Sequence, residues 1–297
     1  MGIRFLIFGF LVFIHAHGFG QMIDNSSGEL FSEDPKFSAD FIGRNKIKRI
    51  KGYYSTKADY DRIRPTNNVY IYEFNEQGQL IKDYKTYRRD TVVRTYSYND
   101  QNKLSILRQS DQFGFHSYLY GYDSLGRLIS KEYRRDVSKT GDKINFDIDQ
   151  SLSVSTENYT YEGNTKQLKQ KYFNSLGKLY KFAFYYTNEN GYLYREETQS
   201  INGNSRSETT FNYNVNGFLS EKTAQKYLGK KITTRIKFEY DTHNNLQAQH
   251  YYRNGVYKTE FQIVYSSQTM LLNALLARDI ETNVITILKF SEYSYYP

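Results

Sequence analysis

The chain has 297 residues and no cysteine, which excludes disulfides, thiol catalysis, cysteine-ligated metals and lipid attachment through cysteine. Its formal net charge is +8, but acidic and basic residues are interleaved and no nucleic-acid-binding motif occurs, so most of the charge is expected on a solvated surface. A content of 31 Tyr and 20 Phe, with no Trp and only 3 Pro, favours β-strands.

Residues 1–20 have the layout of a secretory signal peptide. The basic residue Arg4 lies at the start of an apolar run that ends at Ile14, and the small residues Gly18 and Gly20 come shortly before Gln21. This predicts export, with cleavage after Gly20. The alternative is a membrane anchor, but a run of about a dozen apolar residues is short of the roughly 20 needed to span a bilayer. No stable transmembrane segment is therefore expected after signal removal.

Residues 21–44 mix Ser, Asn, Gly and acidic residues without periodicity, which predicts a flexible leader. A basic, irregular first strand is expected next, around residues 46–54. Lysines on such a strand would protect an exposed sheet edge, and a ligand-binding basic patch is the alternative.

A short motif then recurs through residues 45–265: an aromatic residue, Asn or Asp, two variable positions, Gly or Asn, one variable position and Leu. Six copies have this spacing, at residues 74–80, 98–104, 122–128, 173–179, 213–219 and 240–246, and copies at 161–168 and 186–193 carry one extra residue. The first three are 24 residues apart. Such internal repetition predicts an array of supersecondary units.

Turn chemistry explains the polar half of the motif. Asp or Asn at the first turn position, as in Asp123, and a residue with positive φ at the fourth fit a type I turn with a bulge, a common short hairpin connection. Glycine adopts positive φ without strain, and asparagine tolerates it better than most residues. The fourth-position residues are Gly78, Asn102, Gly126, Gly177, Gly191, Gly217 and Asn244.

Period-two alternation explains the aromatic half. Tyr118, Tyr120 and Tyr122 alternate with other residues, and the same pattern recurs in the trios Phe182, Phe184 and Tyr186 and Phe261, Ile263 and Tyr265. Half-buried strands show this pattern, and stacked copies would form an aromatic ladder across neighbouring strands. Exposed tyrosines could instead stack on sugar rings.

Each repeat needs a second reversal about halfway along, and Asn202-Gly203 and Asn254-Gly255 are strong hairpin signals for it. The predicted fold is all-β: a repetitive antiparallel β-hairpin meander of about 16 to 20 strands, forming a long, twisted or coiled sheet. A sheet of that length must curl, coil or close, and the sequence leaves the choice open.

The segment Tyr122-Asp123-Ser124-Leu125-Gly126-Arg127-Leu128 resembles the YD repeat of RHS-type proteins at every defined position, and the other copies resemble it more loosely. The resemblance covers about two-thirds of the chain. It implies an exported or cell-surface β-rich protein, some relatives of which are proposed to bind carbohydrate. Large members coil the sheet into a shell around a toxic domain. This chain is too short for such a shell, has no toxin-like domain after the repeats, and lacks the Asp-Pro self-cleavage signature near the end.

Two segments depart from the repeat. A polar insertion at residues 136–156 is expected to form a loop, and Asp147 and Asp149 alone fall short of the six to eight oxygens of a calcium site. Residues 266–297 are expected to form a cap or final strands. The run at 270–277 is the most helix-like in the chain, but it could equally be a strand, and both alternatives stay open.

The candidate ligand-binding residues are Arg88, Arg89, Arg134 and Arg135, from two copies of Tyr-Arg-Arg-Asp. If both copies lie at turns, the paired arginines would share a rim and could grip sulfate, phosphate or uronate groups. Solvated turn residues are the competing interpretation.

No catalytic constellation emerges from the sequence. His116, His243 and His250 form no zinc-hydrolase spacing, and no nucleophile elbow or phosphate-binding glycine loop occurs. We therefore expect no enzyme, no cofactor and no metal. The sequence favours an exported, non-catalytic binding or scaffold module at the cell envelope, periplasmic, surface-bound or secreted, with an envelope glycan or another surface protein as partner and no nucleic acid. An outer-membrane β-barrel is the alternative, although the faces between the aromatics are polar. An envelope-glycan hydrolase is a third hypothesis.

Overall fold

The structure is a computed structural model, and it describes residues 21–28, 36–87, 90–203 and 205–297. The described residues contain one helix, α1 (Ala39–Arg44), and one 18-stranded antiparallel sheet. The strands are β1 (Ile47–Lys57), β2 (Arg64–Phe74), β3 (Leu80–Tyr87), β4 (Asp90–Tyr98), β5 (Leu104–Ser110), β6 (Gly114–Tyr122), β7 (Leu128–Ser138), β8 (Ile148–Gly163), β9 (Gln167–Phe173), β10 (Leu179–Thr187), β11 (Leu193–Ser200), β12 (Arg206–Tyr213), β13 (Leu219–Leu228), β14 (Lys230–Tyr240), β15 (Leu246–Arg253), β16 (Val256–Tyr265), β17 (Leu272–Asp279) and β18 (Ile285–Tyr295).

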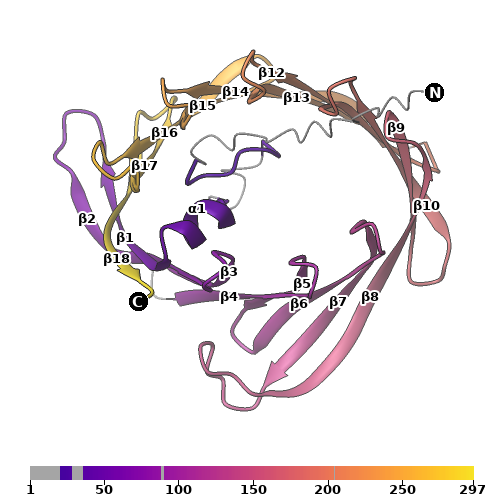
Figure 1. The fold of residues 1–297 in the computed structure, drawn as a ribbon, viewed down its shortest axis with the longest axis horizontal. Helices are drawn as coiled ribbons and strands as arrows, with labels where there is room; N and C mark the ends of the chain where they lie inside the picture. The colour runs from indigo at the N-terminus through magenta and orange to yellow at the C-terminus, as the bar shows by residue number, and fades with distance from the viewer. Residues whose placement is uncertain (1–20, 29–35, 88–89, 204) are drawn as a thin grey trace, which may run out of the picture.

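The sheet closes on itself as a barrel. Each strand pairs with its neighbours in sequence, and β1 pairs with both β2 and β18, from Ile47 opposite Tyr295 to Lys57 opposite Ile285. Figure 1 shows the resulting ring of strands. The antiparallel meander is confirmed, and of the alternatives that the sequence left open the structure shows closure into a barrel. Closure leaves no strand edge unpaired, which removes the need for an edge protected by lysines.

The repeat motif builds one rim of the barrel, which we call the motif rim. The turns there connect β2 to β3, β4 to β5 and β6 to β7, and this alternation continues around the ring. In the turn after β6, Gly126 N–H donates to Asp123 O at 2.9 Å, while Asp123 Oδ1 accepts from the amides of Leu125 and Arg127. The fourth-position residues have positive φ, from 59° at Asn102 to 82° at Gly217.

Two copies of the motif depart from the pattern. The copy at 173–179 joins β9 to β10, so its turn lies at the opposite rim. In the copy at 186–193, a bulge lets Thr187 pair with Leu193, so Thr187 takes the tyrosine's place. The register then puts Tyr186, Phe184 and Phe182 on the outer face, which corrects their expected place in the aromatic ladder. One extra residue reverses the direction of every side chain on the strand.

The inner face carries the ladder. Seven tyrosine hydroxyls donate to the main-chain oxygen of the leucine that opens the previous return strand. The pairs are Tyr98–Leu80, Tyr122–Leu104, Tyr161–Leu128, Tyr213–Leu193, Tyr240–Leu219, Tyr265–Leu246 and Tyr293–Leu272. Each hydroxyl therefore ties one repeat to the preceding one, which explains why tyrosine occupies most copies.

The outer face carries charged residues as well as the aromatic side chains of Phe182, Phe184 and Tyr186. Ion pairs cross between neighbouring strands, such as Lys82–Glu73 at 3.4 Å between β3 and β2, and Arg278–Glu260 at 3.7 Å between β17 and β16. Lys171–Glu162 forms a further pair between β9 and β8. Each of these pairs links two neighbouring strands.

The N-terminal segment, residues 21–28 and 36–44, lies inside the ring of strands, where Figure 1 shows α1. Met22, Ile23 and Ile42 have no exposed surface, and the Phe37 ring lies 4.8 Å from the Tyr72 ring on β2. A Cβ at Gly78 would collide with the main-chain oxygen of Ala39, so this turn needs glycine for contact with α1 as well as for its φ of 79°. The flexible leader predicted for residues 21–44 is corrected accordingly: its described parts are packed.

The insertion forms a strap across the outside of the barrel. Residues 136–138 extend β7, residues 148–156 begin β8, and the loop between them folds back over neighbouring strands. The Phe146 ring lies 4.3 Å from the Phe115 ring, and Lys143 pairs with Asp90 at 2.8 Å. At the C-terminal end, residues 272–279 and 285–295 are strands, not a helix.

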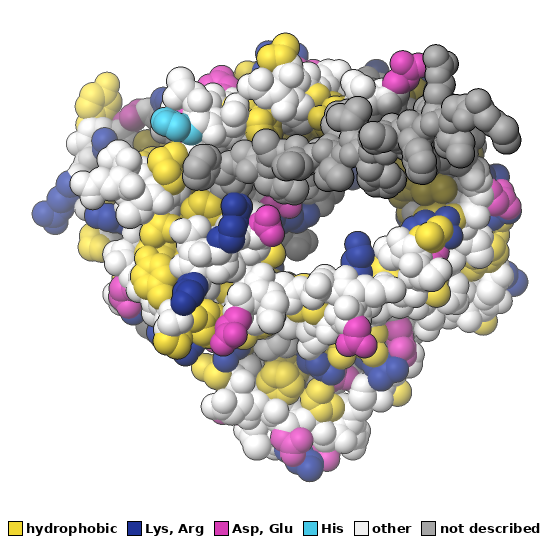
Figure 2. All heavy atoms as spheres, viewed as in Figure 1, with side chains coloured by type: hydrophobic (Ala, Val, Ile, Leu, Met, Phe, Trp, Pro, Cys, Tyr) yellow, Lys and Arg dark blue, Asp and Glu magenta, His cyan; other side chains and the backbone are white. Residues whose placement is uncertain are grey.

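Figure 2 shows that the interior is hollowed beside the N-terminal segment. The described parts of the chain contain no helix that is both long and apolar enough to cross a membrane.

Candidate functional site

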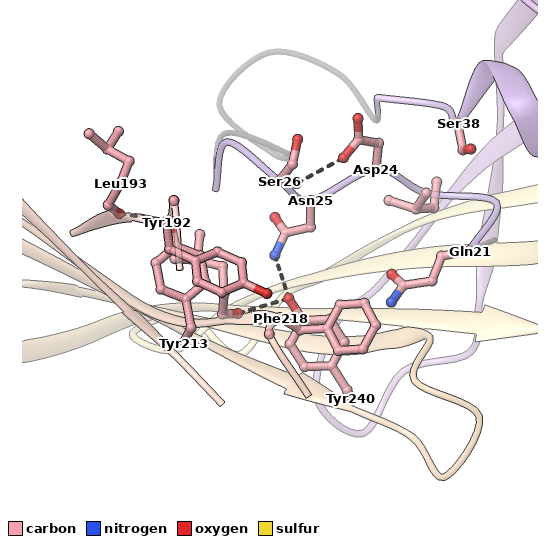
Figure 3. A pocket seen from close by; sticks show the side chains of 14 residues that line it. Gln21, Asp24, Asn25, Ser26, Ser38, Tyr192, Leu193, Tyr213, Phe218 and Tyr240 are labelled. Atoms are coloured by element: carbon pink, nitrogen blue, oxygen red, sulfur yellow. Dashed lines mark hydrogen bonds between the residues drawn. The ribbon is translucent and has the colours of Figure 1, made fainter. Parts of the chain in front are cut away.

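A cavity of about 380 Å³ lies at the motif rim, between the N-terminal segment and the inner wall (Figure 3). Its volume is in the range of small-molecule sites. The N-terminal segment contributes Gln21, Ile23, Asp24, Asn25, Ser26 and Ser38, and the wall contributes Gly191, Tyr192, Leu193, Tyr213, Gly217, Phe218, Leu219 and Tyr240. The cavity exists only because the segment packs inside the barrel.

Aromatic rings form the wall of the cavity. The Tyr192 and Tyr213 rings are 4.8 Å apart, and the Phe218 and Tyr240 rings are 5.2 Å apart. The Tyr213 hydroxyl donates to the main-chain oxygen of Leu193, and the Tyr240 hydroxyl donates to that of Leu219, both at 2.8 Å. Burial raises the pKa of both phenols, which favours the protonated form that donates these hydrogen bonds.

Polar groups face the rings from the N-terminal segment. Asn25 is 6% exposed and donates its Nδ2 hydrogen to Tyr240 Oη at 3.1 Å. Its Oδ1 is buried, and no described residue donates to it. Asp24 Oδ1 accepts from the Ser26 amide at 2.9 Å. A buried acceptor without a donor is costly in a folded protein, so Asn25 Oδ1 marks a place where a ligand donor would be stabilised.

The site combines flat apolar surfaces with a few fixed polar groups, which is the composition of a binding pocket. Its lining residues include no histidine, lysine or arginine and a single carboxylate.

A second cavity, of about 660 Å³, lies beside the first at the same rim. Gln21 lines both cavities and donates its side-chain amide to Asn244 O. The other lining residues are Phe41, Arg44, Asn45, Phe218, His243, Asn244, Asn245, Thr269 and Met270. Phe218 also lines both cavities, so Gln21 and Phe218 lie between them.

The predicted arginine sites are not brought together. Arg88 and Arg89 lie outside the described residues. Arg134 and Arg135 are in the middle of β7 rather than at a turn, and strand alternation points them to opposite faces. Arg134 pairs with Glu132 at 2.8 Å and Arg135 with Asp111 at 2.7 Å, so both are already engaged by carboxylates.

Of the two acidic residues of the insertion, Asp147 pairs with Lys139 at 3.3 Å. Within the described residues, no group of three or more His, Asp or Glu side chains is placed to hold a metal ion.

Sequence reasoning missed Asp24 and Asn25 as site residues. They lie in a stretch without periodicity, and no local signal shows that it enters the barrel. The wall residues were within reach, because Gly191 and Gly217 are motif positions and Tyr213 and Tyr240 are motif tyrosines.

No protein-family model and no curated protein matches the chain. Among solved structures, a porin-like protein from Bacteroides uniformis is 11% identical, covers 84% of this chain and 98% of its own, and has a TM-score of 0.38. A porin-like protein from Bacteroides vulgatus is 9% identical, with 82% and 98% coverage and a TM-score of 0.35. The TcdB2-TccC3 structure without its hypervariable C-terminal region is 13% identical over 82% of this chain and 17% of its own, with a TM-score of 0.28. Likenesses this distant carry no argument about function, and the likeness to the YD repeat stays a resemblance.

Proposed function

We propose that this chain is an exported, non-catalytic β-barrel of the cell envelope that binds a small carbohydrate-like ligand in the 380 Å³ cavity. The observation that carries the proposal is the position of Asn25, whose buried Oδ1 lacks a described donor and lines the same cavity as the Tyr192 and Tyr213 rings.

The chemistry of the two walls supports this ligand class. A sugar ring has an apolar C–H face that stacks on aromatic rings and an edge of hydroxyls that donate and accept hydrogen bonds. In the cavity, the Tyr192 and Tyr213 rings would meet the apolar face, and Asn25 and Asp24 would meet the hydroxyls. A ligand there would supply the donor that Asn25 Oδ1 lacks.

A glycan and cell-wall binding screen on residues 21–297, run at low and high salt, tests the proposal. Binding should be saturable and should survive high salt, and Tyr192→Ala should abolish it. Tyr194→Ala is the matched control, because Tyr194 is similarly exposed, at 43% against 39%, but does not line the cavity. Absence of binding, or equal loss in both variants, would overturn the proposal and would favour a scaffold that binds another surface protein.

A barrel inserted in the outer membrane is the second candidate, because the closed 18-stranded sheet leaves no edge unpaired. A membrane barrel needs an outward apolar band about 25 Å tall. The ion pairs of the outer face, and the strap that covers Phe115, favour an aqueous setting. Alkaline carbonate washing of envelope membranes distinguishes the candidates: an inserted barrel stays with the membrane, and a water-exposed barrel is released.

A further inference from the structure

We propose that the ligand of this cavity carries a protonated amine, as an amino sugar does. This inference rests on the binding function proposed above and narrows its ligand class. It comes from three features of the lining residues: which hydrogens are already donated, which acceptors remain, and where the cations of the chain lie.

Four side-chain donors of the lining have a recorded hydrogen bond. Gln21 donates to Asn244 O and Asn25 donates to Tyr240 Oη. The hydroxyl hydrogens of Tyr213 and Tyr240 go to the oxygens of Leu193 and Leu219. The two tyrosine hydroxyls therefore have no hydrogen left for a ligand, whereas the side-chain amides of Gln21 and Asn25 each keep a second one.

The lining also keeps acceptor capacity beside the hydroxyls of Ser26, Ser38 and Tyr192. Asn25 Oδ1 has no described donor, and one Asp24 oxygen is left after Oδ1 accepts from Ser26 N. Figure 3 shows the Asp24 and Asn25 side chains close together on the segment that faces the rings of Tyr213 and Tyr240. Amide and carboxylate oxygens together select a group rich in N–H donors, and a carboxylate adds charge-assisted strength if that group is positive.

The distribution of charged side chains also favours a cationic ligand. The chain has a formal net charge of +8, yet no lysine or arginine lines this cavity. Elsewhere on the barrel, cations lie over aromatic faces, such as Lys181 over Tyr172 at 3.7 Å and Arg195 over Tyr186 at 4.2 Å.

The four rings of the cavity have no such partner among the described residues. Tyr192 packs on Tyr213 and Phe218 packs on Tyr240, no cation is recorded over any of the four rings, and the Asp24 carboxylate lines the same cavity. Aromatic faces attract cations, and aromatic cages are a recurring way of binding ammonium groups. A ligand ammonium would therefore gain both the rings and the Asp24 charge.

The N–H hydrogens separate this proposal from a general cation site. A primary ammonium can donate to Asn25 Oδ1 and Asp24 at once, whereas a quaternary ammonium has no hydrogen to donate. The site should therefore prefer a primary ammonium over its trimethylated counterpart.

Calorimetric titration of residues 21–297 with glucosamine, glucose and N-acetylglucosamine at neutral pH tests the inference. Glucosamine should bind about tenfold more tightly than either neutral sugar. Asp24→Asn should remove that preference and leave the weaker glucose binding in place. Asp100→Asn, at another turn of the motif rim and not among the lining residues, is the control and should change neither affinity.

The outcomes separate this inference from the proposed function. If glucose binds as tightly as glucosamine, the amine inference is overturned and carbohydrate binding stands. If neither sugar binds but cyclohexylammonium does, and more tightly than its N-trimethyl form, the amine inference is supported and the carbohydrate proposal is overturned. If none of these probes binds, both are overturned.

Discussion

The hydroxyl of Tyr122 donates a hydrogen bond to the main-chain oxygen of Leu104, 2.8 Å away on the neighbouring repeat. Leu104 opens the return strand of one hairpin, and Tyr122 closes the outgoing strand of the next. The same bond recurs around the ring, so the motif tyrosine packs its ring on the inner face and also links its own repeat to the preceding one by a hydrogen bond. A phenylalanine could fill the space but would leave a partly buried oxygen without its donor.

Tyr122→Phe should therefore lower the free energy of unfolding by about 1 kcal/mol, the net value of one such hydrogen bond. Urea unfolding followed by circular dichroism measures the change. Tyr118→Phe is the matched control, because no hydrogen bond of its hydroxyl is recorded among the described residues while its ring stacks on Tyr133 at 5.3 Å. An equal decrease in the free energy of unfolding in both variants would contradict a stabilising role for the Tyr122 hydrogen bond.

Gly78→Ala should destabilise the protein more than Gly177→Ala. Both glycines have positive φ, 79° and 69°, and an alanine there costs about 1–2 kcal/mol. A Cβ at Gly177 meets nothing within 4 Å, whereas at Gly78 it collides with the backbone of α1. Thermal unfolding of the two variants measures the difference. If the two melt together, the packing of α1 against this turn does not contribute to stability.

Closure predicts a disulfide across the seam between β1 and β18. Ser55 and Ile287 are directly opposite each other, at a spacing that a disulfide can bridge. Because the chain has no cysteine of its own, the double variant Ser55→Cys/Ile287→Cys should oxidise to a single internal bridge, detected by mass spectrometry and a gel shift. The pair Ser55→Cys/Thr210→Cys, with Thr210 on β12, should not form one. A seam pair that stays reduced would argue against a closed barrel.

Stability should fall at alkaline pH because of the ladder. Burial raises the pKa of Tyr98 and of Tyr161 to about 12, from about 10 in an unfolded chain. The folded state therefore holds these protons more tightly, so their contribution is fully present below pH 10. It is lost as the pH rises through about 10 to 12. Melting temperatures at pH 9, 10 and 11 should decline only over the last interval. A melting temperature that is unchanged between pH 10 and pH 11 would contradict this.

The local parts of the fold could be predicted from the sequence, and the long-range parts could not. Asp123 and Gly126 encode their turn through backbone geometry, and Tyr118, Tyr120 and Tyr122 encode a strand through alternation. The pairing of Ser55 with Ile287 has no local signal, because it depends on the accumulated curvature of all the strands between them.

In the candidate site, too, some residues could be predicted from the sequence and others could not. Tyr213 and Tyr240 are motif residues whose direction follows from alternation. Asn25 and Asp24 become site residues only when the barrel surrounds them, so their own stretch of sequence does not reveal it. The extra residue before Thr187 shows the limit of motif alignment: Tyr186 matches the pattern by type, but a bulge gives its position to Thr187.

The seam also sets an order of events during folding. Met22 and Ile23 precede every described strand, yet they belong to one buried cluster with Leu272, Leu288 and Phe290, from the last two strands. The N-terminal segment therefore has no complete surface to pack on until the C-terminal strands have paired. The pairing of β1 with β18 must come after the formation of β18. Contacts so distant in sequence are slow to form, since loop closure must precede them. We therefore expect β1 to remain an open edge until late in folding, when pairing with β18 encloses the segment and ends the exposure of that edge to other chains.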